Sequence, residues 1–338
     1  MRHLLARYLL ISDPHGMVIR PGKQKGQILR GIDRIIEGRI NQEKKRNNPT
    51  YFQLIRSFQN DQPYDCLIVL GDFIECVWNE RGILIPRDIR GIEIFKAAIE
   101  MNVPVEKNCV HFIPGDHELG YKLPLSVDPE GGISLASIEN FQYILGLLFT
   151  SWKIGNFNFV TISSSLFSQS TEHLECGERQ KVEALKREQK IFLAKLLLKT
   201  SENEKIFLFL HDPDATEFID KFPCAKKITR IFSGHIHTEG NFRGYQTLGK
   251  ISNSFWGRLI LRLIGLVVGL ISFHPRRVTS KVSKVIAWAK KNPRRLKLFE
   301  KYNLQRVPSS SVLHGGQPGF LVLELYDNEE YEIQKFGA

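Results

Sequence analysis

Acidic and histidine side chains gather in five short clusters, each directly after a run of apolar residues. The clusters contain, in chain order, Asp13 and His15, Asp72, Asp116 and His117, His211, and His235 and His237. Mixed carboxylate and imidazole ligands suit divalent ions such as Mn, Fe, Zn, Ni or Co, whereas Mg and Ca prefer oxygen ligands alone. These residue types therefore predict a metal site.

The spacing indicates that this site holds two divalent metal ions. Asp13 and His15 form an Asp-x-His pair, and His235 and His237 form a His-x-His pair, so each pair can direct two side chains at one point. The clusters together supply more ligands than a single tetrahedral zinc ion needs. A two-metal site accounts better for this surplus.

Six apolar runs must position these clusters. They cover residues 8–11, 66–70, 110–113, 157–162, 206–210 and 228–232. Runs of this length without strict alternation are typical of strands buried on both faces of a sheet. Chemistry in open α/β sheets gathers at the carboxyl ends of such strands.

Helical patterns lie between the apolar runs. Residues 28–40 and 182–197 each place apolar side chains on one helical stripe. A hairpin is expected to pair residues 319–326 with 331–336 across a polar turn. The sequence therefore predicts a layered α/β fold that a C-terminal hairpin completes.

The motifs also resemble a known family. The segments DPH (residues 13–15), GD (71–72), GDHE (115–118), His211 and GHIH (234–237) occur in the order typical of the calcineurin-like metallophosphoesterase superfamily. They cover about two thirds of the chain. The resemblance implies an α/β sandwich of sheets flanked by helices, and a metal-dependent hydrolase of phosphoric esters or anhydrides.

The resemblance also implies a role for each site residue. Asp72 would bridge two divalent ions, with Mn expected and Fe, Zn, Ni or Co as alternatives. A hydroxide between the ions would attack phosphorus in line, and His117 would steady the transition state or protonate the leaving oxygen. One ion would be held by Asp13, His15 and His237, and the other by Asp116, His211 and His235.

Asp116 departs from the family pattern, which usually has Asn at this position. Two divalent ions bring +4, whereas three carboxylates and a hydroxide bring −4, so the site is about neutral instead of about +1. A neutral site attracts an anionic phosphate less strongly. We therefore expect Asp116 to affect the rate and the metal preference more than the fold.

The positive charge of the chain is concentrated in one segment. The chain has 47 Lys and Arg against 36 Asp and Glu, a formal net charge of +11. Residues 250–306 contain 14 basic residues and one acidic residue, Glu300, so this segment carries +13 and the remainder carries −2. With 42% hydrophobic and 25% charged residues, the composition is globular and excludes a disordered or fibrous chain.

The basic segment reads as a helical insertion. Residues 255–273 are mostly apolar, but Arg258 and Arg262 interrupt them, so a transmembrane helix is not expected. Two amphipathic helices with basic faces are expected instead, and these suit an acidic membrane surface. A helical lid over the core is the alternative. The predicted domains are a core (1–249), the insertion (250–307) and the hairpin (308–338).

Several functions remain compatible with these features. The preferred one is hydrolysis of a phosphoester or pyrophosphate in an amphiphile at the inner face of the cytoplasmic membrane. UDP-2,3-diacylglucosamine hydrolases of lipid A synthesis are similar in layout, since they also combine a dimetal site with a basic, apolar insertion. The alternatives are a soluble phosphoprotein or nucleotide phosphatase or phosphodiesterase, a nuclease, and a binding protein with a degenerate site. The five cysteines form no CxxC motif, which favours a reducing, cytoplasmic compartment.

Overall fold

The structure is a computed structural model of the 338-residue chain. It describes residues 2–14, 64–73, 77–78, 84–85, 89–103, 105, 109–119, 133–236, 259, 294–309 and 319–337. The helix predicted over residues 28–40 and almost all of the segment 250–293 lie outside the described residues.

The described strands alternate with helices along much of the chain. The strands are β1 (Leu4–Ser12), β2 (Cys66–Leu70), β3 (Val77–Trp78), β4 (Leu84–Ile85), β5 (Val110–Ile113), β6 (Thr150–Ile154), β7 (Phe157–Thr161), β8 (Lys205–Leu210), β9 (Ile228–Ser233), β10 (Gln305–Arg306), β11 (Gly319–Tyr326) and β12 (Tyr331–Gly337). The α-helices are α2 (Ile89–Asn102), α3 (Asp116–Leu119), α4 (Leu135–Leu145), α5 (Ser165–Ser168), α6 (Cys176–Lys199) and α7 (Thr216–Ile219). Short 3₁₀ helices cover Pro213–Ala215 and Ala225–Lys227, and residues 294–301 are helical.

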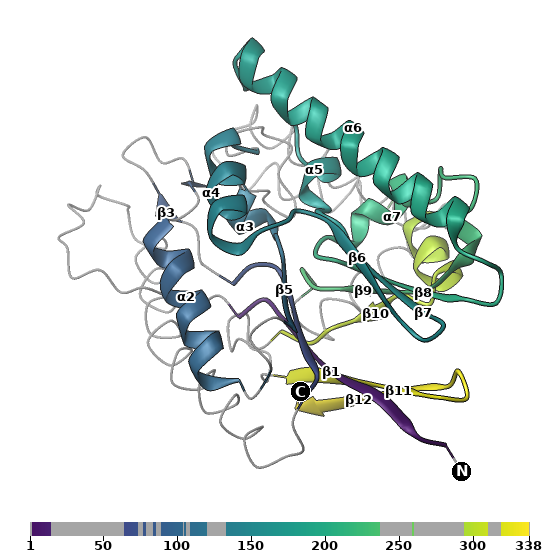
Figure 1. Ribbon diagram of the computed structural model, residues 1–338. Coiled ribbons are helices and arrows are strands. Elements are labelled where there is room, and N and C mark those ends of the chain that lie inside the picture. The colour runs from purple at the N-terminus through teal and green to yellow at the C-terminus, as the bar shows by residue number, and fades with distance from the viewer. Residues whose placement is uncertain are drawn as a thin grey trace.

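Two five-stranded sheets form the centre of the molecule (Figure 1). The first has the order β12-β11-β1-β2-β5, in which β1, β2 and β5 are parallel and β11 runs antiparallel to β1. The second has the order β10-β9-β8-β7-β6, in which β7 to β10 are parallel. All six predicted apolar runs therefore form strands.

The sheets pack face to face because their strands are apolar on both sides. In β1, Tyr8 and Leu10 point into the space between the two sheets, where they meet Phe159 of β7 and Phe209 of β8. The alternate residue Leu9 points outward, into a cluster that includes residues of α2 and α4. This period of two follows from the pleat of a strand, so both faces of β1 are buried.

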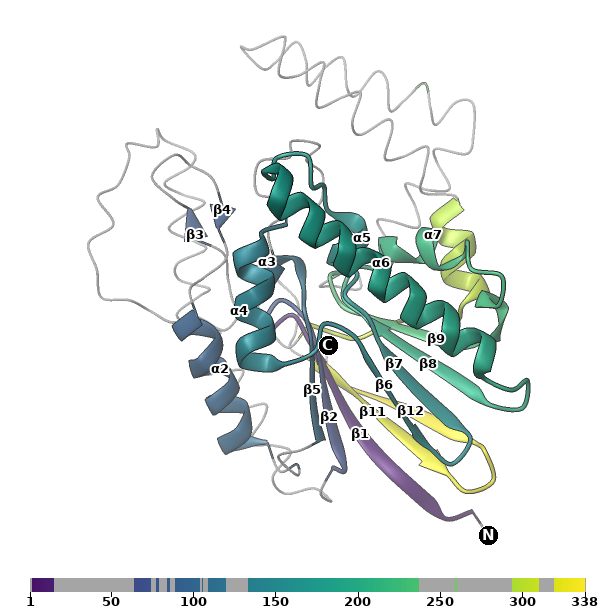
Figure 2. The ribbon, with the colours of Figure 1, turned by 45° about the horizontal axis from the view of Figure 1, so that its top comes forward.

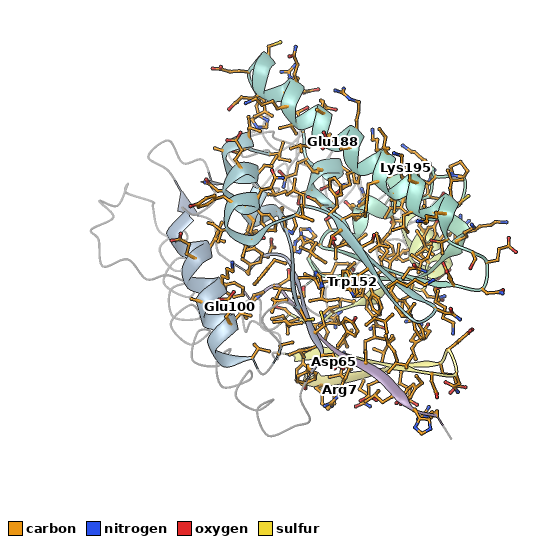
Figure 3. The ribbon with its side chains drawn as sticks, in the orientation of Figure 1. Arg7, Asp65, Glu100, Trp152, Glu188 and Lys195 are labelled. Atoms are coloured by element: carbon orange, nitrogen blue, oxygen red, sulfur yellow. The ribbon has the colours of Figure 1, made fainter. Side chains whose placement is uncertain are left out.

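Helices cover the outer faces of both sheets (Figure 2). The helices α2 and α4 pack on the first sheet, whereas α6 covers the second with Leu193 and Leu197, which are fully or almost fully buried. Glu188 and Lys195 lie on the exposed side of α6 (Figure 3). The predicted layered α/β sandwich, with sheets flanked by helices, is confirmed.

The C-terminal part of the chain completes both sheets. The predicted hairpin forms, because β11 pairs with β12 along its length and also with β1. The helical residues 294–301 and β10 pack on the second sheet, and Leu298 and Tyr302 belong to its outer apolar cluster. These residues fall within the predicted insertion 250–307, yet they are part of the packed core. No helix among the described residues is both long and apolar enough to cross a membrane.

Candidate metal centre

The candidate site residues follow the carboxyl ends of five parallel strands. Asp13 and Asp72 follow β1 and β2, and Asp116 opens α3 three residues after β5. The second sheet contributes His211 after β8 and His235 after β9. The site therefore forms where corresponding edges of the two sheets meet, as expected for a sheet whose strands run in parallel.

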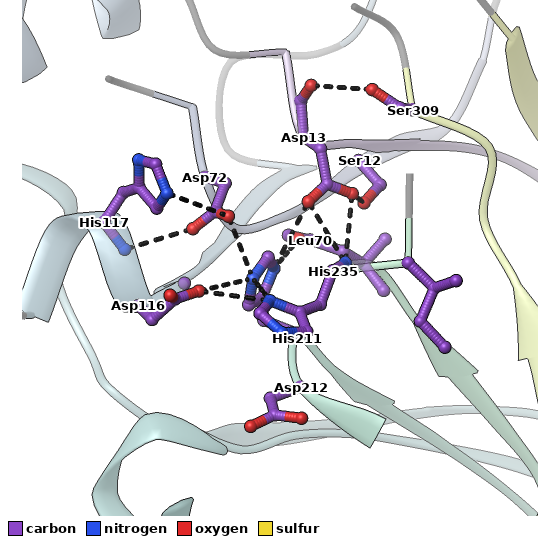
Figure 4. Close-up of polar contacts among 12 residues, drawn as sticks. Ser12, Asp13, Leu70, Asp72, Asp116, His117, His211, Asp212, His235 and Ser309 are labelled. Atoms are coloured by element: carbon purple, nitrogen blue, oxygen red, sulfur yellow. Dashed lines mark hydrogen bonds and ion pairs between the residues drawn. The ribbon is translucent and has the colours of Figure 1, made fainter. Parts of the chain in front are cut away.

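Four of these residues form a tight group (Figure 4). One ligand atom from each of Asp72, Asp116, His211 and His235 lies within 4.8 Å of the others. The Nε2 atom of His211 is 3.0 Å from Oδ1 of Asp116 and 3.2 Å from Oδ2 of Asp72. It is also 3.2 Å from Nδ1 of His235. The predicted bridging residue and the predicted ligands of one metal are therefore brought together.

Asp13 lies beside this group. The backbone N–H of His235 donates to both carboxylate oxygens of Asp13, at 3.1 Å each, and the hydroxyl of Ser12 donates to Oδ2. The Oδ1 atom of Asp13 is 4.0 Å from Nδ1 of His211. Its predicted partners at the other metal, His15 and His237, lie outside the described residues.

His117 lies on the other side of Asp72. Its backbone N–H donates to Oδ1 of Asp72 at 3.1 Å, and its Nε2 atom is 3.8 Å from Oδ2 of Asp72. Only 9% of the residue is exposed. The structure therefore places the predicted proton donor next to the predicted bridging carboxylate.

The loops at the site require unusual backbone geometry. Asp13, Asp72 and His235 have φ angles of 46°, 50° and 64°, which lie in the left-handed region that residues other than glycine rarely adopt. Gly115 must also be glycine, because a Cβ atom there would lie 2.2 Å from Oδ1 of Asp72. Backbone strain at three candidate ligands is typical of a functional site.

Glu118 has a role that the sequence did not reveal. Its Oε2 atom accepts the backbone N–H of Asp72 at 2.9 Å and that of Gly115 at 2.8 Å, and the residue is fully buried. The carboxylate thus ties the loop after β2 to the loop after β5. The GDHE motif contains this residue, and its place in the motif was the only sequence signal.

Burial and mutual contact shift the ionisation of the group. Burial, opposed by His211, raises the pKa of Asp13 to about 6. Burial lowers the pKa of His235, but the Asp116 carboxylate outweighs it and raises that pKa to about 9. Burial raises the pKa of Asp116, but the contacts of this carboxylate with His235 and His211 outweigh burial and hold its pKa well below the usual range. Protons on the imidazoles offset the buried carboxylates, a task that a cation can take over.

The donor set fits a divalent ion. Nδ1 of His211 donates to the backbone carbonyl of Leu70 at 2.8 Å, so its Nε2 atom faces the carboxylates without a proton when the ring is neutral. Such an outer hydrogen bond is the usual way of orienting a histidine ligand. Asp72 and Asp116 are 1% and 2% exposed, and buried carboxylates require a compensating cation. The mixture of oxygen and nitrogen atoms suits a borderline metal.

One family of known proteins matches most of the chain. A model of the calcineurin-like phosphoesterase family matches residues 6–239, which is more than half of the chain. Five chains of solved structures match, among them a purple acid phosphatase from yellow lupin (Lupinus luteus) seeds with 13% sequence identity and a TM-score of 0.38. That match covers 69% of this chain and 38% of the phosphatase. A comparison with curated protein sequences gave no match.

Proposed function

Since the chain belongs to the calcineurin-like phosphoesterase family, we propose that it is a metal-dependent phosphoester hydrolase and that it works with two divalent ions. Asp72 would contact both ions. Asp116, His211 and His235 would hold one ion, and Asp13, His15 and His237 the other. The observation that carries the proposal is the group of two carboxylates and two imidazoles, three of them buried and one partly buried, whose ligand atoms lie within 4.8 Å of one another.

The residues of the chain divide the work of the reaction. Bound divalent ions supply charge neutralisation at the phosphate and lower the pKa of coordinated water. His117 is close enough to Asp72 to act on a phosphate held there, and an imidazole can donate a proton to the leaving oxygen near pH 7. The hydrogen bond from the His117 backbone to Asp72 sets the spacing between these two groups.

Metal analysis tests this proposal directly. The purified protein should bind two equivalents of Mn²⁺ at saturation and hydrolyse a small chromogenic phosphodiester in proportion to the metal bound. His117→Ala should keep both equivalents and lose turnover. Fewer than two equivalents in the unaltered protein would contradict the dimetal proposal.

The substrate that we propose is a phosphorylated amphiphile of the UDP-2,3-diacylglucosamine type, bound at the inner face of the cytoplasmic membrane. Support comes from the segment 250–306, which carries 14 basic residues against one acidic residue and includes a long apolar stretch. Each basic residue near an anionic lipid surface contributes roughly 1 kcal/mol to binding. The segment begins 13 positions after His237, a proposed metal ligand, in the sequence.

Part of this positive charge is paired with acidic residues of the core. Arg295 pairs with Asp214 at 3.1 Å and with Glu217 at 3.0 Å, and the ammonium of Lys301 is 2.6 Å from Asp220. Arg295 is only 8% exposed. Nine of the 14 basic residues precede position 294, and we propose that membrane contact comes mainly from these.

Charge reversal in the full chain tests the membrane proposal. Changing Arg276, Arg277, Lys281 and Lys284 to Glu should abolish sedimentation with vesicles of phosphatidylglycerol and leave turnover of the small chromogenic substrate unchanged. The matched control changes four exposed lysines of α6, namely Lys181, Lys190, Lys195 and Lys199, to Glu. Equal losses in both variants, or no sedimentation of the unaltered protein, would contradict the proposal.

A soluble phosphoprotein or nucleotide phosphatase is the second candidate. The ion pairs that fix residues 294–301 to the core favour it, because they would also suit the base of a lid. A turnover screen with Mn²⁺ separates the candidates. It compares a UDP-linked diacyl sugar, a phosphopeptide, cyclic nucleotides and single-stranded DNA, the last of which tests for a nuclease.

A further inference from the structure

Residues 294–309 include the described end of the candidate insertion (250–307) and reach the proposed metal centre, and we call them the strap. The strap contains the helical residues 294–301, the two-residue strand β10, and Ser309. Three of its side chains, Tyr302, Val307 and Ser309, are at most 3% exposed. It is therefore packed into the fold along its length.

One end of the strap contacts the turn that contains His235. The N–H of Val307 donates to the carbonyl of Ser233 at 2.8 Å, two residues before His235. The Arg306 side chain donates from Nη1 to the carbonyl of Ile236 at 3.4 Å, one residue after it. These two contacts bracket His235, whose φ angle is 64°.

The same end of the strap contacts the loop that contains Asp13. The hydroxyl of Ser309 donates to the backbone carbonyl of Asp13 at 3.0 Å (Figure 4), and Ser309 also forms a parallel bridge with Ser12. Asp13 and His235 are themselves joined, since the N–H of His235 donates to the Asp13 carboxylate. The strap thus reaches a candidate ligand of each metal.

The other end of the strap is fixed to the segment after His211. Arg295 pairs with Asp214 and Glu217, and the hydroxyl of Tyr302 donates to Asp220 at 2.8 Å. These contacts fix the strap to the segment 214–220. Strained backbone at the ligands persists only where the surrounding structure determines it, and the strap supplies that surrounding structure for Asp13 and His235.

We propose that Ser309 and Arg306 are positioning residues that hold the Asp13 and His235 turns in the geometry needed for metal binding. The inference rests on the proposed dimetal function. Neither residue belongs to a recognised motif of the chain. They act through backbone carbonyls, so they change ligand geometry without supplying a ligand atom.

Metal binding to single variants tests the proposal. Ser309→Ala removes the donor to the Asp13 carbonyl and should weaken binding of one Mn²⁺ equivalent about tenfold, the usual size of an outer-contact effect. The value of kcat should fall at limiting Mn²⁺ and recover at saturating Mn²⁺, while KM stays within about twofold. Ser309→Thr keeps the hydroxyl and should restore the affinity. Arg306→Met should weaken metal binding in the same way, and Arg306→Lys should do so less.

A control separates positioning from a general loss of stability. The hydroxyl of Thr200 also donates to a backbone carbonyl, that of Leu196 at 2.8 Å, and the residue is 5% exposed at the end of α6. Thr200→Val should lower thermal stability and leave the Mn²⁺ affinity unchanged. Unchanged affinity in both Ser309→Ala and Arg306→Met, or an equal loss in Thr200→Val, would overturn the positioning role. Fewer than two Mn²⁺ equivalents in the unaltered protein would overturn the dimetal function instead.

Discussion

The imidazole of His211 donates its Nδ1 hydrogen to the backbone carbonyl of Leu70 across 2.8 Å, which joins the end of β8 to the end of β2. The two strands belong to different sheets. The bond therefore sets the spacing of the two sheet edges at the metal centre, and it directs Nε2 of His211 towards Asp72 and Asp116. The orientation of one ring thus depends on how the two sheets pack.

Asp72→Ala is expected to abolish metal loading and turnover together, because Asp72 is the only residue proposed to contact both ions. The fold should survive, since β2 is held by buried apolar side chains on both faces. Metal content and chromogenic turnover measure the two losses. Asp65→Ala is the matched control. Asp65 directly precedes the first residue of β2, at the end away from the metal centre (Figure 3), and its carboxylate accepts the backbone N–H of Arg7 at 2.7 Å. This variant should therefore keep both metals. An inactive Asp72→Ala protein with full metal content would contradict the bridging role.

Asp116→Asn is expected to stay active, within about tenfold of the unaltered rate, because the amide oxygen can still bind a metal and the site gains about one positive charge. In the metal-free protein the pKa of His235 should fall from about 9, since Asp116 is the carboxylate that raises it most. Steady-state kinetics and NMR titration of the histidine rings measure the two effects. Complete inactivity would show that position 116 does not match the family Asn.

Glu118→Ala is expected to lower the free energy of unfolding by about 3 kcal/mol, because the backbone N–H groups of Asp72 and Gly115 lose their buried acceptor. Glu118→Gln keeps an acceptor oxygen and should lose less than half as much. Urea denaturation followed by circular dichroism gives the values. Glu139→Ala, at an exposed position of α4, serves as the control and should be close to neutral. Equal stability of all three variants would contradict the role of Glu118.

His111 should make the protein less stable in mild acid. Burial lowers the pKa of His111 to about 4, against about 6.5 in an unfolded chain. Between these values the unfolded state binds the extra proton, so stability is present above pH 6.5 and is lost as the pH falls towards 4. We expect His111→Phe, which preserves stacking on Trp152 at 3.8 Å, to reduce the loss between pH 6.5 and pH 5 by about 2 kcal/mol. Urea denaturation at both pH values tests this, and parallel losses in the two proteins would contradict it.

The sequence predicted local elements well and long-range contacts poorly. The six strand runs, the helix α6 and the C-terminal hairpin were predicted because buried strands and amphipathic helices leave a local periodicity. The antiparallel strand β6 was missed, because its alternate residues are only partly buried and its sequence TSWKI has no long apolar run. Which strands share a sheet depends on packing that no local window contains.

The same distinction holds at the metal centre. The motifs that contain Asp72, Asp116, His211 and His235, and the order of these motifs, predicted that the four residues share one metal site. Ser309 contacts Asp13 across almost 300 positions of sequence, and Ser309 belongs to none of the motifs of the chain. A hydroxyl that acts on a backbone carbonyl leaves no residue pattern, so only the folded structure shows it.

The left-handed backbone at Asp13, Asp72 and His235 costs folding free energy at residues that metal binding is proposed to need. Such a conformation costs roughly 1–2 kcal/mol for most residues with a side chain and less for Asp, and glycine relieves it. A redesign that only relaxed the backbone would therefore place glycine at these three positions. It would remove three of the proposed metal ligands, together with the hydrogen bonds that the carboxylates of Asp13 and Asp72 accept from the backbone.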